Sequence, residues 1–291
     1  MTADDVRSGP GPERPGPELQ VDLFLLAGEF PSADHATTLR RAVDYARAAE
    51  AAGFDGVWFA EHHFISYGVC PSAVALTGYV LGVTTRLRVG TAAAILSNRH
   101  PLALAEEAAL LDAVSGGRFD LGVARGGPWI DLDVFGTGLA RYTEGFAESL
   151  DLLLAALSGR PTVAADGEHF RFPEVVMIPR PDRPVPVWVA ATSSSTVDLA
   201  ARRGLPLLMG MHDDDRAKAA MLDRYTGPAG VPHASAHLAF VADTTDQAEK
   251  ALRATMPGWL ARTGEYRRVD DTPPRLRDLA AYLDHLFAIH P

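Results

Sequence analysis

The chain has 291 residues, of which 47% are hydrophobic, so it is long enough to bury the core of one large α/β domain. Its 27 basic and 37 acidic residues give a formal net charge of −10, which argues against a nucleic-acid or acidic-membrane partner. No apolar run reaches the roughly 18 residues of a membrane span, and the lone Cys70 excludes an internal disulfide framework and a cysteine-based metal site. Residues 1–18 are rich in glycine, proline and charge and lack the apolar core of a signal peptide. We therefore expect a disordered tail followed by one domain over residues 19–291, in a cytoplasmic protein.

Strand and helix patterns alternate along the rest of the chain. Short apolar runs predict buried parallel strands, and apolar residues at helical spacing predict helices between them. The predicted strands span residues 21–27, 54–60, 87–96, 119–124, 186–191, 205–210 and 237–242. The predicted helices span residues 37–52, 72–83, 101–114 and 142–157, then two helices ending near residues 203 and 225, then 245–262 and 276–289. Residues 158–184 show no regular pattern and are predicted to be irregular.

Repeated strand–helix units favour parallel strands with right-handed crossovers, and a (β/α)8 TIM-barrel fold is the leading prediction. A doubly wound sheet is the alternative. No segment after Arg262 has the pattern of an eighth strand. We therefore expect a barrel that is incomplete at its C-terminal end, unless the final helix or a partner subunit covers the gap.

Three ionisable residues, Glu61, His62 and His63, follow directly on the predicted strand at 54–60. Ligands bind at the carboxyl ends of parallel strands, so these side chains are candidates for acid–base chemistry. Adjacent residues of an extended segment point in opposite directions, so only one of the two imidazoles can face the barrel axis. A pair of core histidines is the structural alternative, and a metal site is disfavoured because adjacent histidines are poorly placed to chelate one ion.

Other strand ends carry further candidates. Thr91 to Ala94 are small, which by itself favours ordinary tight packing but would also let a flat ring approach the backbone. Arg125 precedes two glycines and could bind a phosphate or carboxylate or equally form a surface salt bridge. Thr192 to Thr196 are five consecutive hydroxyl residues at a predicted helix start, a pattern that favours an anion site over a plain N-cap. No G-x-G-x-x-G or Walker loop is present, which weakens the case for a Rossmann nucleotide fold.

Taken in order, several segments resemble the bacterial luciferase-like flavin-dependent monooxygenases, specifically the branch of the luciferase α-subunit. The resemblance covers roughly residues 21–251. It is carried by GFDGVWFAEHHF at 53–64, RLRVGTAAAIL at 86–96, HPLALAEEAALLDAVSGGRFDLGVARG at 100–126, DVFG at 133–136 with Arg141, and VPVWVAATSSSTVDLAARRGLP at 185–206.

The resemblance implies a TIM barrel that binds reduced FMN, supplied by a separate flavin reductase, and oxidises a small organic substrate with O2 through a flavin peroxide adduct. It implies that His62 is the catalytic histidine beside the flavin and that Asp131 lies near the substrate. It implies a non-proline cis peptide at Ala92-Ala93 beneath the flavin ring. Flavin contacts, chiefly on the phosphate side, are implied for Glu61, Arg125, Arg141, Ala191, Ser193, Ser194, Ser195 and Thr196.

The chain departs from the family where luciferases often carry a reactive cysteine and a loop glutamate: it has Ala124 and Thr192 there. The family's mobile lid region, about residues 258–274 here, is short. Two alternatives stay open, use of the deazaflavin F420 in hydride transfer and a non-catalytic flavin-binding subunit. A homodimer through the helices at 72–83 and 101–114 is expected, and the composition is compatible with secondary metabolism.

Overall fold

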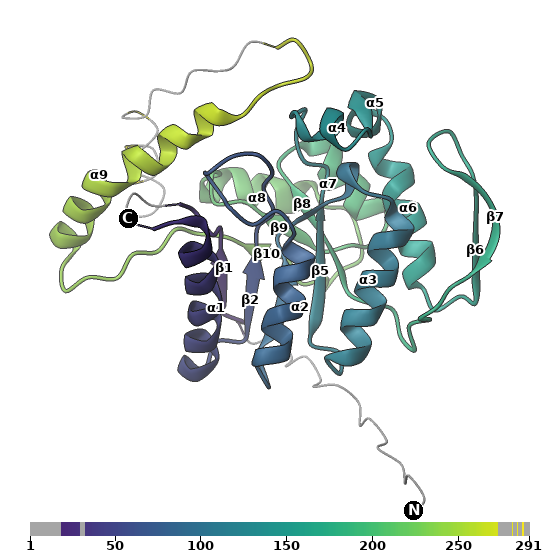
Figure 1. Ribbon diagram of the computed structural model, residues 1–291, viewed down its shortest axis with the longest axis horizontal. Helices are drawn as coiled ribbons and strands as arrows, with labels where there is room; N and C mark the ends of the chain where they lie inside the picture. The colour runs from purple at the N-terminus through teal and green to yellow at the C-terminus, as the bar shows by residue number, and fades with distance from the viewer. Residues whose placement is uncertain (1–18, 30–32, 273–280, 282–283, 285–286, 288–291) are drawn as a thin grey trace, which may run out of the picture.

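The structure is a computed structural model that describes residues 19–29, 33–272, 281, 284 and 287 (Figure 1). The predicted tail over residues 1–18 and most of the predicted helix over 276–289 lie outside the described residues. No described helix is long and apolar enough to cross a membrane.

The main sheet is parallel, and its strands follow chain order. In the described part of the chain the order is β1-β2-β3-β5-β8-β9-β10, with β4 paired to β5. Phe24 pairs with Trp58, and Trp58 pairs with Gly90, so the register places the carboxyl ends of neighbouring strands at one edge. The strands are β1 (Asp22–Leu25), β2 (Gly56–Phe59), β3 (Arg88–Thr91), β4 (Ala94–Ile95), β5 (Phe119–Ala124), β8 (Val187–Ala191), β9 (Leu207–Met209) and β10 (Ala234–Ser235).

Helices cover the outer face of this sheet, and their ends follow local sequence signals. Asp34 caps the first helix by accepting from Thr37 N, and Gly53 ends it in the left-handed conformation at φ 86°. His100 caps the helix that opens at Pro101. The helices are α1 (His35–Ala52), α2 (Ala73–Val83), η1 (Leu96–Asn98), α3 (Pro101–Val114), α4 (Asp131–Val134), α5 (Gly138–Thr143), α6 (Phe146–Leu157), α7 (Ser194–Arg202), α8 (Asp215–Arg224), α9 (Thr245–Leu260) and η2 (Ala261–Glu265).

The main hydrophobic core lies between the sheet and these helices. Phe59, Phe119 and Leu121 from the strands and Leu104 and Leu153 from α3 and α6 are fully buried in it. Burial of apolar surface on this scale is the main force that holds the strand–helix units together.

The strand predicted over residues 87–96 is interrupted. Its two parts are β3 and β4, and the intervening ladder with β5 is completed by a side chain. The Thr91 hydroxyl donates to Gly122 O at 2.7 Å and accepts from Gly122 N at 3.0 Å. A Cβ at position 122 would collide with Thr91 O, so glycine is required for this close approach.

The parallel (β/α)8-type fold is confirmed, and the barrel is incomplete. Seven strands curl in chain order, and within the described ranges no strand joins β10 to β1. Two predictions of local structure were wrong. Residues 158–184 contain an antiparallel hairpin, β6 (Thr162–Asp166) and β7 (Arg171–Val176), and the seventh strand lies at Ala234–Ser235 and not at residues 237–242.

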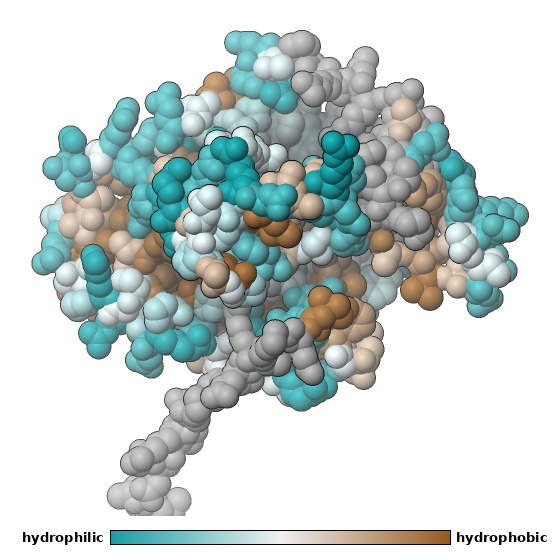
Figure 2. All heavy atoms as spheres, turned by 180° about the vertical axis from the view of Figure 1, so that it is seen from behind, coloured by the Kyte–Doolittle hydropathy of each residue, from teal (hydrophilic) through white to brown (hydrophobic). Residues whose placement is uncertain are grey.

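The two ends of the barrel differ. Helices α4, α5 and α9 lie at the end where the strands terminate (Figure 1). The far face of the molecule is largely hydrophilic, with hydrophobic atoms in separate patches between polar side chains (Figure 2).

Candidate active site

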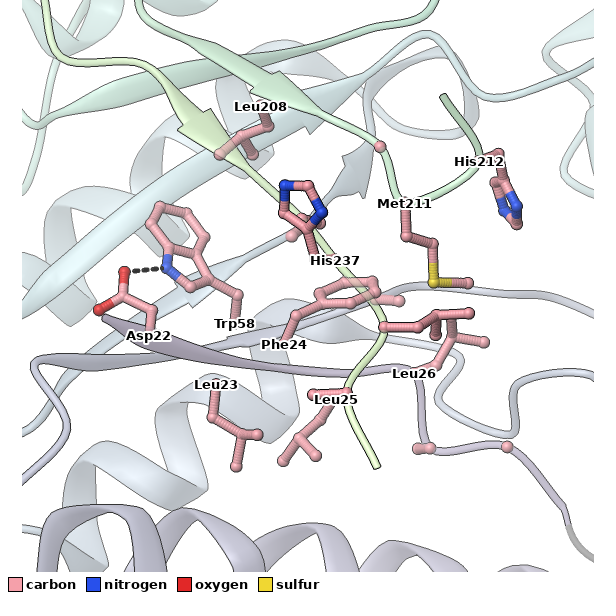
Figure 3. Close-up of a pocket in the computed structure, with 18 of the residues that line it drawn as sticks. Asp22, Leu23, Phe24, Leu25, Leu26, Trp58, Leu208, Met211, His212 and His237 are labelled. Atoms are coloured by element: carbon pink, nitrogen blue, oxygen red, sulfur yellow. Dashed lines mark hydrogen bonds between the residues drawn. The ribbon is translucent and has the colours of Figure 1, made fainter. Parts of the chain in front are cut away.

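A cavity of about 2620 Å³ fills the open barrel and reaches its C-terminal mouth. Figure 3 shows Asp22 and Phe24 on the cavity side of β1 and Leu26 directly after this strand, with Met211 and His237 facing them. This volume exceeds the roughly 300–1,000 Å³ of a usual ligand pocket, because the cavity continues into the gap between β1 and β10. The predicted residues among its walls are Glu61, His62, Ala92, Ala93 and Asp131.

His62 lies in the cavity wall at the end of β2. Its backbone N–H donates to Cys70 O at 2.9 Å, and its ring meets the ring of Tyr67 edge to face. Its Nδ1 atom is buried and has no hydrogen-bond partner among the described residues. Burial, and then the nearby charge of His63, lowers the pKa of His62 to about 4. The imidazole is therefore neutral near pH 7 and can accept a proton or donate one N–H to a ligand.

Glu61 is held inside the protein and not free in the cavity. Its side chain is fully buried and accepts from Arg99 at 2.9 Å, from Ile95 N at 3.1 Å and from Ala73 N at 3.0 Å. Burial alone would raise the pKa of Glu61, but the pKa is lowered because His63, Arg99 and these two N–H groups stabilise the carboxylate. Glu61 thus joins the β2 end to β4 and to the start of α2.

The shifted pKa values of His62 and Glu61 should make the folded protein less stable in acid. Between pH 6.5 and 4 His62 is protonated in the unfolded chain but not in the folded protein, so the unfolded state binds more protons. The free energy of unfolding therefore decreases as the pH is lowered through this range. The loss in unfolding free energy should be on the order of 3 kcal/mol. Glu61, whose folded pKa is depressed, adds a further loss below its unfolded value of 4.5. Urea unfolding at a series of pH values would measure this.

The matched control is His62→Gln, which should flatten the pH dependence of unfolding between pH 6.5 and 4. An equally steep profile in that variant would show that other groups dominate.

His63 and Asp131 both reach the cavity but are already engaged. The His63 ring packs edge to face on Phe135, with its Nε2 atom 3.5 Å from the Glu61 carboxylate. Asp131 opens α4, is buried and accepts from Asn98 at 2.7 Å. The substrate-side role implied for Asp131 stays a prediction, and its Oδ2 atom already has this amide partner.

Ala92 and Ala93 lie next to the end of β2, in the break between β3 and β4. The peptide bond between them is cis, as the resemblance implies. Ala92 N donates to Phe59 O at 2.7 Å, so this segment is tied directly to the strand that carries His62. Their side chains are single methyl groups, so little projects from the cavity wall at this point.

The two candidate phosphate-side arginines do not line the cavity. Arg125 lies over the rings of Tyr142 and Phe146, and its Nε atom is buried without a hydrogen-bond partner in the described structure. The Arg141 guanidinium lies 3.8 Å from the centre of the Phe170 ring, and burial lowers the pKa of Arg141. Both guanidinium groups are thus partly desolvated, which strengthens their attraction for an anion.

The hydroxyl run after β8 forms the start of α7. Ser193 is the N-cap and accepts from Thr196 N, and its Oγ atom lies 3.1 Å from Ser195 Oγ and 3.0 Å from Thr196 Oγ1. Ala191, Ser193, Ser194, Ser195 and Thr196 do not line the cavity, whereas Thr192 does. The N-cap function is thus present, and anion binding at this helix end stays a prediction.

Several residues of this site were not predicted from the sequence. Two of them, Arg99 and Asn98, contact the Glu61 and Asp131 carboxylates and follow a strand end, which is a signal that could have identified them. The others come from distant segments that only the fold brings together. They are Tyr67, Met211, His212, His237 and Trp259.

One other group could hold an ion. Glu144, Glu168 and His169 each place a ligand atom within 4.8 Å of the others, but both glutamates are exposed and none of the three lines the cavity.

The family model and the sequence relatives that match this chain agree on one protein family. The family model described as luciferase-like monooxygenase matches residues 19–288. The alkanal monooxygenase alpha chain of the Kryptophanaron alfredi symbiont is 32% identical over 251 residues, which cover 83% of this chain and 70% of that protein.

Three solved structures share the fold. Monooxygenase RslO1 from Streptomyces bottropensis matches with a TM-score of 0.76 at 22% identity, covering 84% of this chain and 79% of that one. The oxygenating constituent of 3,6-diketocamphane monooxygenase from Pseudomonas putida, in complex with FMN, has a TM-score of 0.70 at 18% identity, covering 92% and 83%. An F420-dependent secondary alcohol dehydrogenase has a TM-score of 0.67 at 18% identity, covering 93% and 82%.

Proposed function

The chain belongs to the luciferase-like monooxygenase family, and from that premise we propose that it is an FMNH2-dependent monooxygenase that oxidises a small organic substrate with O2. It is the oxygenase of a two-component system in which a separate reductase supplies the reduced flavin. A place in secondary metabolism is part of the proposal.

The observation that carries the proposal is the common position of His62 and the Ala92-Ala93 segment. Both line one cavity at the strand ends, and Ala92 is hydrogen bonded to the strand that presents His62. A flat ring fits against small side chains, and the imidazole of His62, which lines the same cavity, would lie beside it. The small side chains and the imidazole together fit a flavin ring.

The anionic end of the cofactor has its own candidates. The unpartnered, buried Nε atom of Arg125 and the desolvated guanidinium of Arg141 would bind the flavin phosphate, together with the N-terminus of α7 at Ser193 to Thr196. These groups follow β5 and β8, which pair directly in the sheet. Bound reduced FMN would supply the electrons and activate dioxygen.

The chain's own residues orient the reactants, exclude water and hold protons. Neutral His62 is the group that moves or holds a proton beside the flavin. Trp129, Tyr266 and Met256 line the mouth of the cavity and limit the access of water. Asp131 lies at the same mouth and is the proposed polar contact of the substrate.

Use of F420 is the main alternative, because one of the structures that share this fold is an F420-dependent enzyme. The cluster of cationic and hydroxyl groups at the ends of β5 and β8 fits the single phosphate of FMN, and 32% identity to an alkanal monooxygenase alpha chain favours oxygen chemistry. A non-catalytic flavin-binding subunit is the second alternative. The lack of a strand between β10 and β1 within the described residues favours it, and the His62 imidazole in the cavity wall argues against it.

We also propose a homodimer through α2 and α3. Tyr79 on α2 and Leu110 and Val114 on α3 are large apolar side chains that are 60%, 52% and 71% exposed. Burying them against a second copy would remove this apolar surface from water. Light scattering should give twice the chain mass, and a clean monomer at all concentrations would contradict the dimer.

Labelled dioxygen tests the reaction. The protein is incubated with FMN, NADH, a flavin reductase and a panel of small apolar compounds under isotopically labelled O2. We expect a product that carries one labelled oxygen atom and that requires both the protein and the reductase. Oxidation without oxygen incorporation, supported by F420 under anaerobic conditions, would favour the alternative.

A further inference from the structure

Tyr67 connects His62 to a helix from the end of the chain. Its ring meets the imidazole of His62 edge to face, with centroids 5.4 Å apart and an angle of 83°. The same ring stacks on the indole of Trp259 in α9, with centroids 4.7 Å apart and an angle of 15°. Trp259 Nε1 also donates to Tyr67 O at 2.9 Å, across 192 residues of sequence. The three rings therefore form one chain of contacts from the β2 end to α9.

Two glycines leave room for the end rings of this stack. A Cβ at Gly68 would lie 2.5 Å from His62 Nδ1, and a Cβ at Gly28 would collide with Trp259 Nε1. The imidazole and the indole thus each lie directly against backbone. Each end ring therefore has little room to move toward its glycine, and Tyr67 contacts both rings from between them.

A polar cluster fastens the end of α9 to the same loop. Arg262 donates to Ser66 at 2.5 Å and to Glu29 at 3.0 Å, and Glu265 accepts from both Ser66 N and Ser66 Oγ at 2.6 Å. Ser66 directly precedes Tyr67. These bonds therefore hold the C-terminal end of α9, which carries Trp259, close to the loop that carries Tyr67.

The stack belongs to a second hydrophobic cluster that is separate from the main core. Tyr67, Met211, Met256, Trp259 and Leu260 are all buried in it, at 1–6% exposure. Because three of these five side chains come from α9, this helix forms the cover over the His62 side of the cavity.

We propose that Tyr67 and Trp259 are positioning residues for His62: through their stack, α9 fixes the orientation of the imidazole and keeps water away from it. The inference rests on the proposed function, in which His62 is the group beside the flavin. The other titratable groups that act on His62 are Glu61 and His63 in its own segment and His212 after β9. None of these is changed by a substitution on α9.

Nuclear magnetic resonance of the His62 ring tests the proposal without flavin or substrate. In Trp259→Ala, water should reach the imidazole, so the pKa of His62 should rise from about 4 toward 6.5 by on the order of one unit or more. The ring-proton shifts of His62 should change with it. Trp259→Phe keeps an aromatic ring on Tyr67 and should retain a His62 pKa close to that of the unmodified protein.

The matched control is Leu260→Ala, which removes a fully buried side chain from the same cluster but leaves the stack. It should leave the pKa of His62 in place. Gly28→Ala displaces the indole without removing it and should act like Trp259→Ala, so it decides the matter if Trp259→Ala does not fold. The proposal is overturned if the His62 pKa is unchanged in the folded variant, or if Leu260→Ala raises it equally. Failure of FMN to bind would instead contradict the proposed function and leave this result intact.

Discussion

Replacing His62 with alanine should lower the turnover number by about 10²- to 10⁴-fold, the range that a positioned acid–base group contributes. The imidazole of His62 lies in the wall of the cavity that Ala92 and Ala93 also line, and its pKa of about 4 keeps it neutral near pH 7. Its removal takes away the proton-holding group but leaves the small side chains and the arginines of the proposed flavin site. Steady-state turnover with reductase-supplied FMNH2 measures the loss, and the far-ultraviolet circular dichroism should be unchanged.

His63→Ala is the comparison for this variant. The His63 ring packs on Phe135 and lies beside the Glu61 carboxylate, so its loss should affect stability more than turnover. A smaller loss of turnover in His63→Ala than in His62→Ala is therefore expected. Full turnover in His62→Ala, or an equal loss in both variants, would remove His62 from its proposed role.

Glu61→Ala should lower the free energy of unfolding by about 3–5 kcal/mol, the usual result of removing one partner of a buried ion pair. The substitution leaves the Arg99 guanidinium, which is only 20% exposed, without its carboxylate. It also leaves the N–H groups of Ile95 and Ala73 without an acceptor, and each orphaned buried donor is costly. Urea unfolding at pH 7 measures the change.

The structure offers a control with a similar ion-pair distance. Asp166 and Arg171 lie 2.8 Å apart, against 2.9 Å for Glu61 and Arg99, but both are largely exposed, so Asp166→Ala should cost about 0–1 kcal/mol. Glu61→Gln keeps an acceptor for the backbone and should lie between the two. A cost for Glu61→Ala no larger than that for Asp166→Ala would show that the buried carboxylate does not hold the β2 end, β4 and α2 together.

Local sequence patterns correctly predicted individual buried strands and helix ends. The run from Gly56 to Phe59 is continuously apolar and forms the buried strand β2, and Gly53 ends α1 as expected from its sequence. The β6–β7 hairpin was missed because prolines and glycines near its ends suggested an irregular stretch. The signal that could have found it is Asp166-Gly167 between two short strand-like runs.

The seventh strand was misplaced for a tertiary reason. Residues 237–242 have a strand-like apolar pattern, but a strand needs a neighbour to pair with. Only Ala234 and Ser235 pair with β9, and with no strand between β10 and β1 in the described ranges, Val241 remains 94% exposed. Local propensity alone does not supply the missing partner.

The residues of the candidate site likewise fall into those that the sequence predicted and those that it did not. The strand-end rule placed Glu61, His62, Ala92 and Ala93 on one cavity, because parallel strands end at the same edge. Tyr67 and Trp259 were not predicted as site residues, because their contact spans 192 residues and depends on where α9 packs. Glu61 was predicted to contact the flavin. In the structure its carboxylate contacts Arg99 and backbone N–H groups, and these contacts favour a structural role.

The central claim is that this cavity takes reduced FMN, and an anaerobic titration tests it most directly. The protein is titrated with reduced FMN and, in parallel, with reduced F420, and binding is followed by the change in tryptophan fluorescence, since Trp58, Trp129 and Trp188 line the cavity. We expect saturable binding of one FMNH2 per chain, tighter than that of F420, and weaker binding in Arg125→Ala. Tighter binding of F420, or no saturable binding of reduced FMN, would contradict it.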